Sequence, residues 1–107
     1  MEEKYFKGKE NQITADHLRA GETCIVVGYG NSMTPKLASG EAILMEPVTE
    51  DTILKKGDIV LVKVNGHFYC HLISAIRGGS YQISNNHKHV NGWVSKNNIY
   101  GKMISKV

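Results

Sequence analysis

Over most of this chain, hydrophobic positions are grouped in short runs of the length of β-strands, and polar positions separate the runs. Apolar runs of roughly four to ten residues recur from residue 23 onward, and clusters of glycine and asparagine separate them. The clearest runs lie at 24–28, 42–45, 59–64, 67–76, 81–84 and 99–107. We therefore predict a mainly β fold of about seven short strands.

The clearest helical pattern precedes the first strand. Residues 14–21 read Thr-Ala-Asp-His-Leu-Arg-Ala-Gly and predict one or two helical turns, with Thr14 as the N-cap and Gly21 as the C-terminal stop. Residues 1–12 are polar, and we expect them to be loosely docked. The chain is thus divided into a tail with a short helix, residues 1–22, and a β domain, residues 23–107.

The strongest local signal is a β-hairpin. Asn65-Gly66 lies between two apolar runs, and this pair favours the type I′ turn, in which both central residues have positive φ. A two-residue turn places His71 opposite Val60 and Tyr69 opposite Val62. Both faces of the hairpin are apolar near its middle, so we expect it to be buried on both sides. Asn91-Gly92 gives a second, similar hairpin signal.

Composition narrows the functional classes. The chain has 107 residues, enough for one domain, and a net charge of +3 with scattered lysines, so nucleic acid is not an expected partner. No apolar run is long enough to span a membrane, and the charged N-terminus is unlike a signal peptide, which predicts a cytoplasmic protein. Cys24 and Cys70 fit small buried hydrophobic positions. No cofactor or metal is expected: His87-Lys88-His89 would need a third ligand and fits a solvated loop better.

Two residues could form an activated nucleophile. Ser32 follows the first strand within Gly30-Asn31-Ser32-Met33-Thr34-Pro35, where Gly30 and Asn31 can adopt the conformations that expose a hydroxyl. The Ser32 backbone N–H is the candidate oxyanion donor, and Asn31 and Gly30 complete the oxyanion and positioning group. His71 is the candidate base. Taken singly, each residue is better explained without chemistry, Ser32 as an ordinary turn serine and His71 as a core or edge histidine.

Ser32 and His71 both lie in motifs that resemble those of one protein family. The resemblance rests on residues 30–35, on Gly40-Glu41, on the strand that begins Lys56-Gly57-Asp58, and on Cys70-His71-Leu72-Ile73. Over residues 23–107 the chain resembles the signal-peptidase and LexA-type repressor superfamily of serine proteases. The resemblance implies the β-fold of that superfamily, Ser32 as nucleophile, His71 as base and a peptide or protein substrate. A histidine base makes the chain most similar to the archaeal and endoplasmic-reticulum signal peptidases.

The departures from that pattern leave two functions open. Ser84-Asn85-Asn86 stands where histidine-type members have Gly-Asp-Asn-Asn, and their acidic third residue falls near Asn91-Gly92. No carboxylate follows Asp58, so no acid from that region can orient His71. We also expect neither the membrane anchor of true signal peptidases nor the DNA-binding half of the repressors. One hypothesis is a soluble serine endopeptidase with a Ser-His dyad. The other is an inactive β domain that binds a peptide or partner protein in the same groove.

Overall fold

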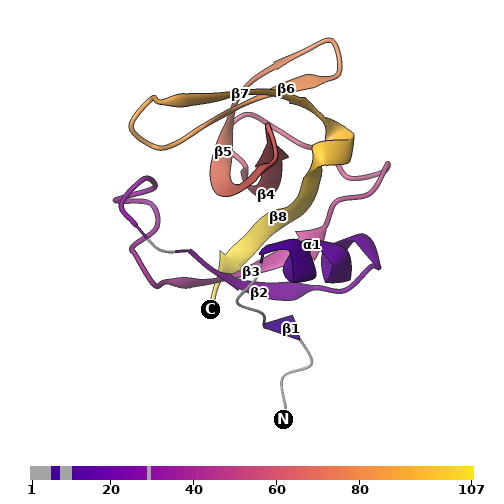
Figure 1. The fold of residues 1–107 in the computed structure, drawn as a ribbon, viewed down its shortest axis with the longest axis vertical. Helices are drawn as coiled ribbons and strands as arrows, with labels where there is room; N and C mark the ends of the chain where they lie inside the picture. Colours follow the sequence, from indigo (N-terminus) through magenta and orange to yellow (C-terminus); the bar gives the residue numbers. More distant parts are fainter. Residues whose placement is uncertain (1–5, 8–10, 29) are drawn as a thin grey trace.

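One eight-stranded sheet organises the described part of the chain. The computed structural model describes residues 6–7, 11–28 and 30–107. The sheet order is β1-β2-β3-β8-β4-β5-β6-β7, with β1 parallel to β2 and every other neighbouring pair antiparallel. Figure 1 shows β8 running between the β2–β3 side and the β4–β7 side of the molecule. The strands are β1 (Phe6–Lys7), β2 (Cys24–Val27), β3 (Ala42–Pro47), β4 (Ile59–Val64), β5 (His67–Arg77), β6 (Ser80–Ser84), β7 (Val90–Ser95) and β8 (Ile99–Lys106). The prediction of a mainly β fold with one short N-terminal helix is confirmed.

The helix, α1 (Asn11–Arg19), begins earlier than the sequence predicts. Thr14 lies inside it and is 2% exposed, so the prediction of Thr14 as N-cap is wrong. Thr14 is buried together with Ala15 and Leu18, and this packing overrides the residue's preference for a cap. The predicted stop at Gly21 is confirmed, because its φ is +97° and its N–H donates to Leu18 O at 2.9 Å. The predicted loose tail falls largely on residues outside the described part.

The β4–β5 hairpin has the predicted turn and register. Asn65 and Gly66 have φ values of 50° and 82°, as a type I′ turn requires. Val60 pairs with His71, and Val62 pairs with Tyr69. Each face of the hairpin packs into a different hydrophobic cluster. Burial on both sides is therefore confirmed, and it holds β5 in a fixed position for any residue that projects from it.

Asn91-Gly92 is not a turn, and this prediction is wrong. Both residues lie inside β7, and the β6–β7 connection is formed by residues 85–89. A Cβ at Gly92 would lie 3.1 Å from Val64 Cγ1, so the glycine allows β7 to pass close to β4. The pairing shifts between Ile83↔Gly92 and Ser84↔Val90, which makes Asn91 the extra residue of a β-bulge. A bulge changes the direction in which a side chain projects from a strand.

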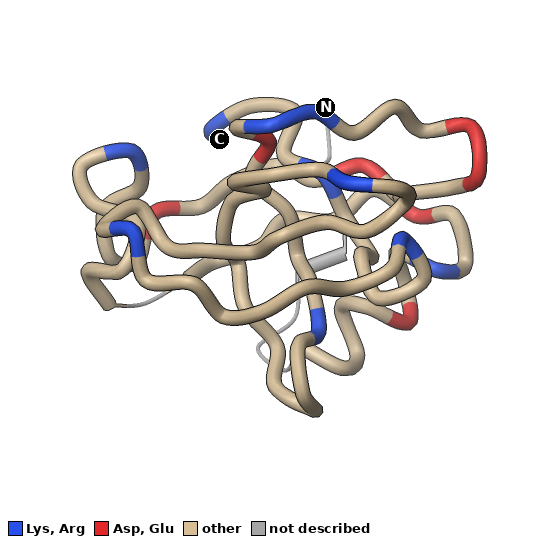
Figure 2. Tube along the Cα trace, turned by 90° about the horizontal axis from the view of Figure 1, so that it is seen from above, with Lys and Arg blue, Asp and Glu red and all other residues tan. Residues whose placement is uncertain are grey.

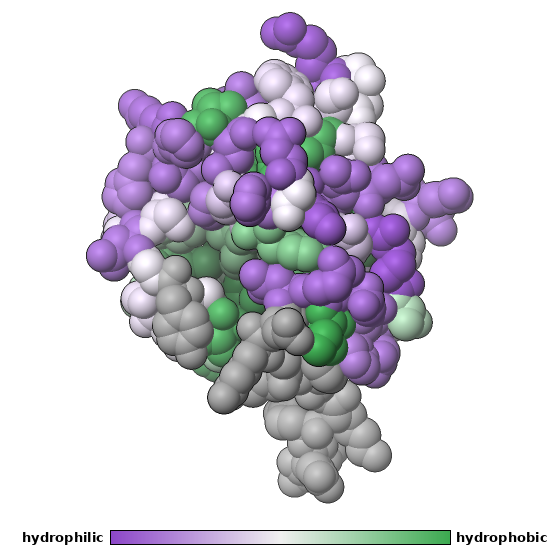
Figure 3. Space-filling model, in the orientation of Figure 1, coloured by the Kyte–Doolittle hydropathy of each residue, from purple (hydrophilic) through white to green (hydrophobic). Residues whose placement is uncertain are grey.

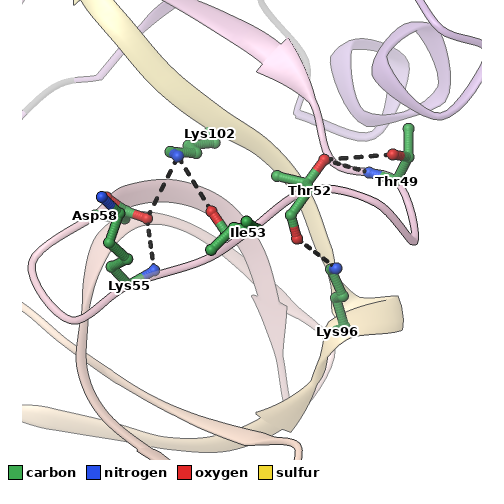
Figure 4. A network of polar contacts seen from close by, with 7 residues as sticks. All are labelled: Thr49, Thr52, Ile53, Lys55, Asp58, Lys96 and Lys102. Carbon is green, nitrogen blue, oxygen red and sulfur yellow. Dashed lines mark hydrogen bonds and ion pairs between the residues drawn. The ribbon is translucent and has the colours of Figure 1, made fainter.

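Lysine ammonium groups hold the long connection between β3 and β4. Lys96 Nζ donates to Glu50 O at 2.9 Å. It also donates to Thr52 O at 2.5 Å (Figure 4). Lys102 Nζ donates to Ile53 O at 3.2 Å and lies 3.7 Å from Asp58 Oδ2. These cations therefore serve as structural donors. Figure 2 shows the other Lys and Arg residues at separate places around the trace.

The contact between α1 and the sheet depends on Gly101 of β8. A Cβ at this buried position would lie 2.8 Å from Leu18 Cδ1 and 3.2 Å from Met45 Sδ. We therefore expect Gly101→Ala to lower the free energy of unfolding by about 1–3 kcal/mol through overpacking. Denaturant unfolding provides the measurement, and Gly28→Ala is the control because its Cβ would meet no atom within 4 Å. Equal unfolding midpoints for the two variants would contradict the expectation.

Candidate active site

The loop after β2 carries Ser32 next to residues that pack into the core. Met33 and Leu37 are 5% and 8% exposed and anchor the loop in the cluster beneath α1. Leu37 N–H donates to Met33 O at 3.0 Å, and Gly30 N–H donates to Ser39 Oγ at 2.9 Å. Gly30 has a φ of +103°, which a residue with a side chain rarely adopts. The loop thus leaves Ser32 half-buried, beside its anchored neighbour Met33.

The structure brings the two sequence-predicted residues together. Ser32 Oγ lies 3.1 Å from Nε2 of His71, although 39 residues separate them in the chain. His71 comes from β5 and is 7% exposed. The ring of Tyr69 stacks on its imidazole with the centroids 4.9 Å apart. This distance is within the range for a serine hydroxyl that donates a hydrogen bond to a base.

Asn91 contacts the other ring nitrogen of His71, and sequence reasoning missed this role. Asn91 Oδ1 lies 2.7 Å from His71 Nδ1. An amide oxygen can only accept, so Nδ1 carries the hydrogen and Nε2 presents its lone pair to Ser32. The group that contacts Nδ1 is thus the neutral amide of Asn91 and not a carboxylate. The sequence did contain one signal for this role, because the acidic third residue of the histidine-type relatives falls near Asn91-Gly92 in this chain.

The electrostatic surroundings keep the imidazole neutral. Burial lowers the pKa of His71 and outweighs the opposing effect of the hydrogen bond to Asn91, and the nearby His89 lowers the pKa further. Burial also raises the pKa of the Cys70 thiol, which lines the same groove, to about 12. At neutral pH the site therefore holds an imidazole able to accept a proton, and Cys70 remains a protonated thiol.

A groove of about 1000 Å³ opens beside Ser32 and His71. Figure 3 shows apolar side chains at the bottom of a hollow on this face of the molecule. The apolar lining residues include Val26, Val27, Met33, Leu37, Ala38, Ile43 and Phe68. In β5, residues 67–71 pair with β4 on one side, and the pairing with β6 begins only at Leu72. Among the described residues, the opposite edge of residues 68–71 therefore has no strand partner, and it borders the groove.

The comparisons with known proteins identify the family. The family model described as Peptidase S24-like matches residues 2–104. The chain belongs to the Peptidase S24-like family. No curated protein sequence matches this S24-like chain. In the described part of the S24-like domain, no helix is long and apolar enough to cross a membrane, and no three His, Cys, Asp or Glu side chains gather as metal ligands would.

The residues predicted around the oxyanion differ in their contacts within this S24-like domain. Gly30 N–H already donates to Ser39, which leaves Gly30 a positioning role. The carbonyl oxygen of Asn31 accepts hydrogen bonds from Thr34 and from His87 Nε2. Among the described residues no acceptor is found for Ser32 N–H, so it stays the candidate oxyanion donor beside the hydroxyl.

Proposed function

We propose that this S24-like domain is a serine endopeptidase in which Ser32 attacks an extended peptide segment. The observation that carries the proposal is the chain of contacts from Ser32 Oγ to His71 Nε2 and from His71 Nδ1 to Asn91 Oδ1. The first contact supplies a base within reach of the hydroxyl, and the second fixes the tautomer that can accept its proton. Ser32 and His71 are the catalytic residues, and Asn91 is a positioning residue.

Acyl transfer then follows in balanced steps. His71 Nε2 takes the hydroxyl proton as Ser32 Oγ forms a bond to the peptide carbonyl carbon, and the carbonyl oxygen becomes an oxyanion near Ser32 N–H. The imidazolium gives its proton to the leaving amine as the C–N bond breaks. Water then attacks the acyl carbon as His71 takes its proton, and the imidazolium returns that proton to Ser32 Oγ as the acyl C–Oγ bond breaks and the carboxylic acid product leaves.

The groove supports a peptide in extended conformation as substrate. The unpaired edge of residues 68–71 offers backbone donors and acceptors to an added strand, and β-strand addition is a common mode of peptide binding. The apolar lining favours side chains without charge next to the reactive serine. A partner protein would supply such a segment from an exposed loop or terminus.

A fluorophosphonate probe tests the nucleophile directly. We expect wild-type protein to be labelled at Ser32 and Ser32→Ala to remain unlabelled, because the probe reacts with activated serine hydroxyls. Ser105→Ala, which removes an exposed serine from β8, is the matched control and should label like wild type. Mass spectrometry of the labelled peptide gives the site. Equal labelling of wild type and Ser32→Ala would contradict the proposal.

A second function is favoured by one observation, the amide of Asn91 in the place of a carboxylate. A neutral amide does not stabilise the imidazolium that forms during acyl transfer as a carboxylate does. The alternative proposal is therefore a domain that binds a peptide or partner protein in the groove without cleaving it. In that case Ser32→Ala retains full binding, and incubation with a bound peptide yields no product. Cleavage that disappears in Ser32→Ala would rule this alternative out.

A further inference from the structure

The connection between β6 and β7 contacts the loop that carries Ser32. Asn86 N–H donates to Ser32 O at 2.8 Å, and Asn86 Nδ2 donates to Thr34 O at 2.9 Å. The next residue adds a third contact, in which His87 Nε2 donates to Asn31 O at 2.9 Å. The two segments are distant in sequence, since Thr34 and His87 are 53 residues apart. His87 is exposed, as the prediction of a solvated loop requires, and these bonds also dock the loop against the segment that carries Ser32.

The connection itself is held in one conformation. Asn85 Oδ1 accepts from His87 N–H at 2.8 Å and from His89 N–H at 3.0 Å. Asn85 N–H also donates to His89 O at 2.9 Å. Because these bonds close the turn locally, the donors of Asn86 face the Ser32 loop without depending on that loop for their own order.

The same hairpin reaches both catalytic residues. Asn86 precedes β7 and contacts the backbone on either side of Met33, whereas Asn91 within β7 contacts the His71 ring. A short, internally bonded segment therefore links the position of the nucleophile to the position of the base. Alignment of this kind matters, because a misplacement of about 1 Å between reacting groups can lower a rate by about 10²-fold.

We propose that Asn86 is a positioning residue that holds Ser32 Oγ at hydrogen-bonding distance from His71. The inference rests on the proposed peptidase function. The Asn86 side chain contributes the donor to Thr34 O, and loss of that donor leaves the loop attached through fewer bonds. Asn86 touches neither the imidazole nor Asn91 in any described hydrogen bond, so it acts on alignment and leaves the basicity of His71 unchanged.

Fluorophosphonate labelling measured against pH tests the role. We expect Asn86→Ala to lower the second-order labelling rate about tenfold, with the midpoint of the pH profile unchanged. Asn86→Asp is a near-isosteric second variant that lacks the donor, and it should show the same loss. Asn98→Ala is the matched control, because Asn98 Nδ2 makes the same kind of bond to Lys63 O at 3.2 Å away from the site. Wild-type rates in both Asn86 variants would overturn the inference.

A second readout separates this inference from the proposed function. In ¹⁵N-labelled protein, the His71 Nε2 resonance reports its hydrogen bond with Ser32, and Ser32→Ala gives the reference for the broken bond. We expect Asn86→Ala to shift this resonance toward the Ser32→Ala value and Asn98→Ala to leave it in place. The shift would support positioning by Asn86 even if wild-type protein is not labelled, an outcome that would defeat the peptidase proposal alone. An unshifted resonance would overturn the positioning role whatever the activity.

Discussion

Replacing His71 with alanine is expected to lower the rates of peptide cleavage and of Ser32 labelling by about 10⁴-fold or more. The imidazole is the group that accepts the Ser32 proton, and neither of the other acid–base side chains considered in the described part of the groove, Glu41 and Cys70, can replace it. Glu41 lines the groove but accepts a hydrogen bond from Ala38 N–H and pairs with Lys106 at 3.4 Å, and these contacts lower its pKa. Cys70 stays protonated because burial raises its pKa to about 12.

The pH dependence of the wild-type reaction gives a second test of the same base. Only neutral imidazole accepts the proton, so the rate rises as pH increases through the pKa of His71. Burial lowers that pKa from its usual 6.5, and we therefore expect half-maximal labelling below pH 6.5. His67→Ala removes an exposed histidine from the same strand and should keep the wild-type profile. A His71→Ala rate within tenfold of wild type would show that another group acts as the base.

The parts of the fold that were predicted correctly depend on contacts close in sequence. Asn65-Gly66 fixes the β4–β5 hairpin through two residues with positive φ, and the alternation of side chains then places Tyr69 and His71 on one face. The stop signal at Gly21, just after α1, likewise depends only on neighbouring residues. Such signals need only the geometry of neighbouring residues.

The errors occurred where distant contacts override local preference. Asn91-Gly92 has the sequence of a turn, but β7 needs a glycine there because Val64 of β4 lies against it. Thr14 has the preference of a cap, but the core under α1 buries it within the helix. Neither contact can be read from residues nearby in the chain.

The candidate site was only partly predictable for the same reason. Ser32 was singled out by its loop and His71 by its apolar strand, yet only the family resemblance suggested that they meet. Asn86 and Asn91 reach the site through the β6–β7 connection and through a bulge. Both features depend on the pairing of β6 with β7, whose register shifts at Ile83. The catalytic roles of Ser32 and His71 remain predictions for experiment.

Two substitutions of Asn91 are expected to change the rate of Ser32 labelling in opposite directions: Asn91→Leu lowers it and Asn91→Asp raises it. Asn91→Leu has a similar volume but no acceptor for Nδ1–H, so the imidazole loses its fixed tautomer and orientation. Loss of an orienting aspartate lowers turnover by about 10⁴-fold in a serine protease, and we expect a loss of about 10²–10³-fold for this neutral amide. Asn91→Asp keeps the acceptor and adds a negative charge. The charge stabilises the imidazolium in the transition state, which predicts a gain of about tenfold or more at pH 8.

The direction in which the pH profile of labelling shifts gives a further test of the two Asn91 variants. A carboxylate at position 91 favours protonated imidazole and raises the pKa of His71, so the labelling profile of Asn91→Asp moves to higher pH. Its gain over wild type must then shrink as pH falls toward 6, because more of its His71 is already protonated. Asn98→Asp adds the same charge on the 3₁₀ turn before β8 and should leave both rate and profile unchanged. If Asn91→Asp and Asn91→Leu both retain the wild-type profile and rate, Asn91 does not orient His71 and the proposed acyl transfer proceeds through the Ser32–His71 pair alone.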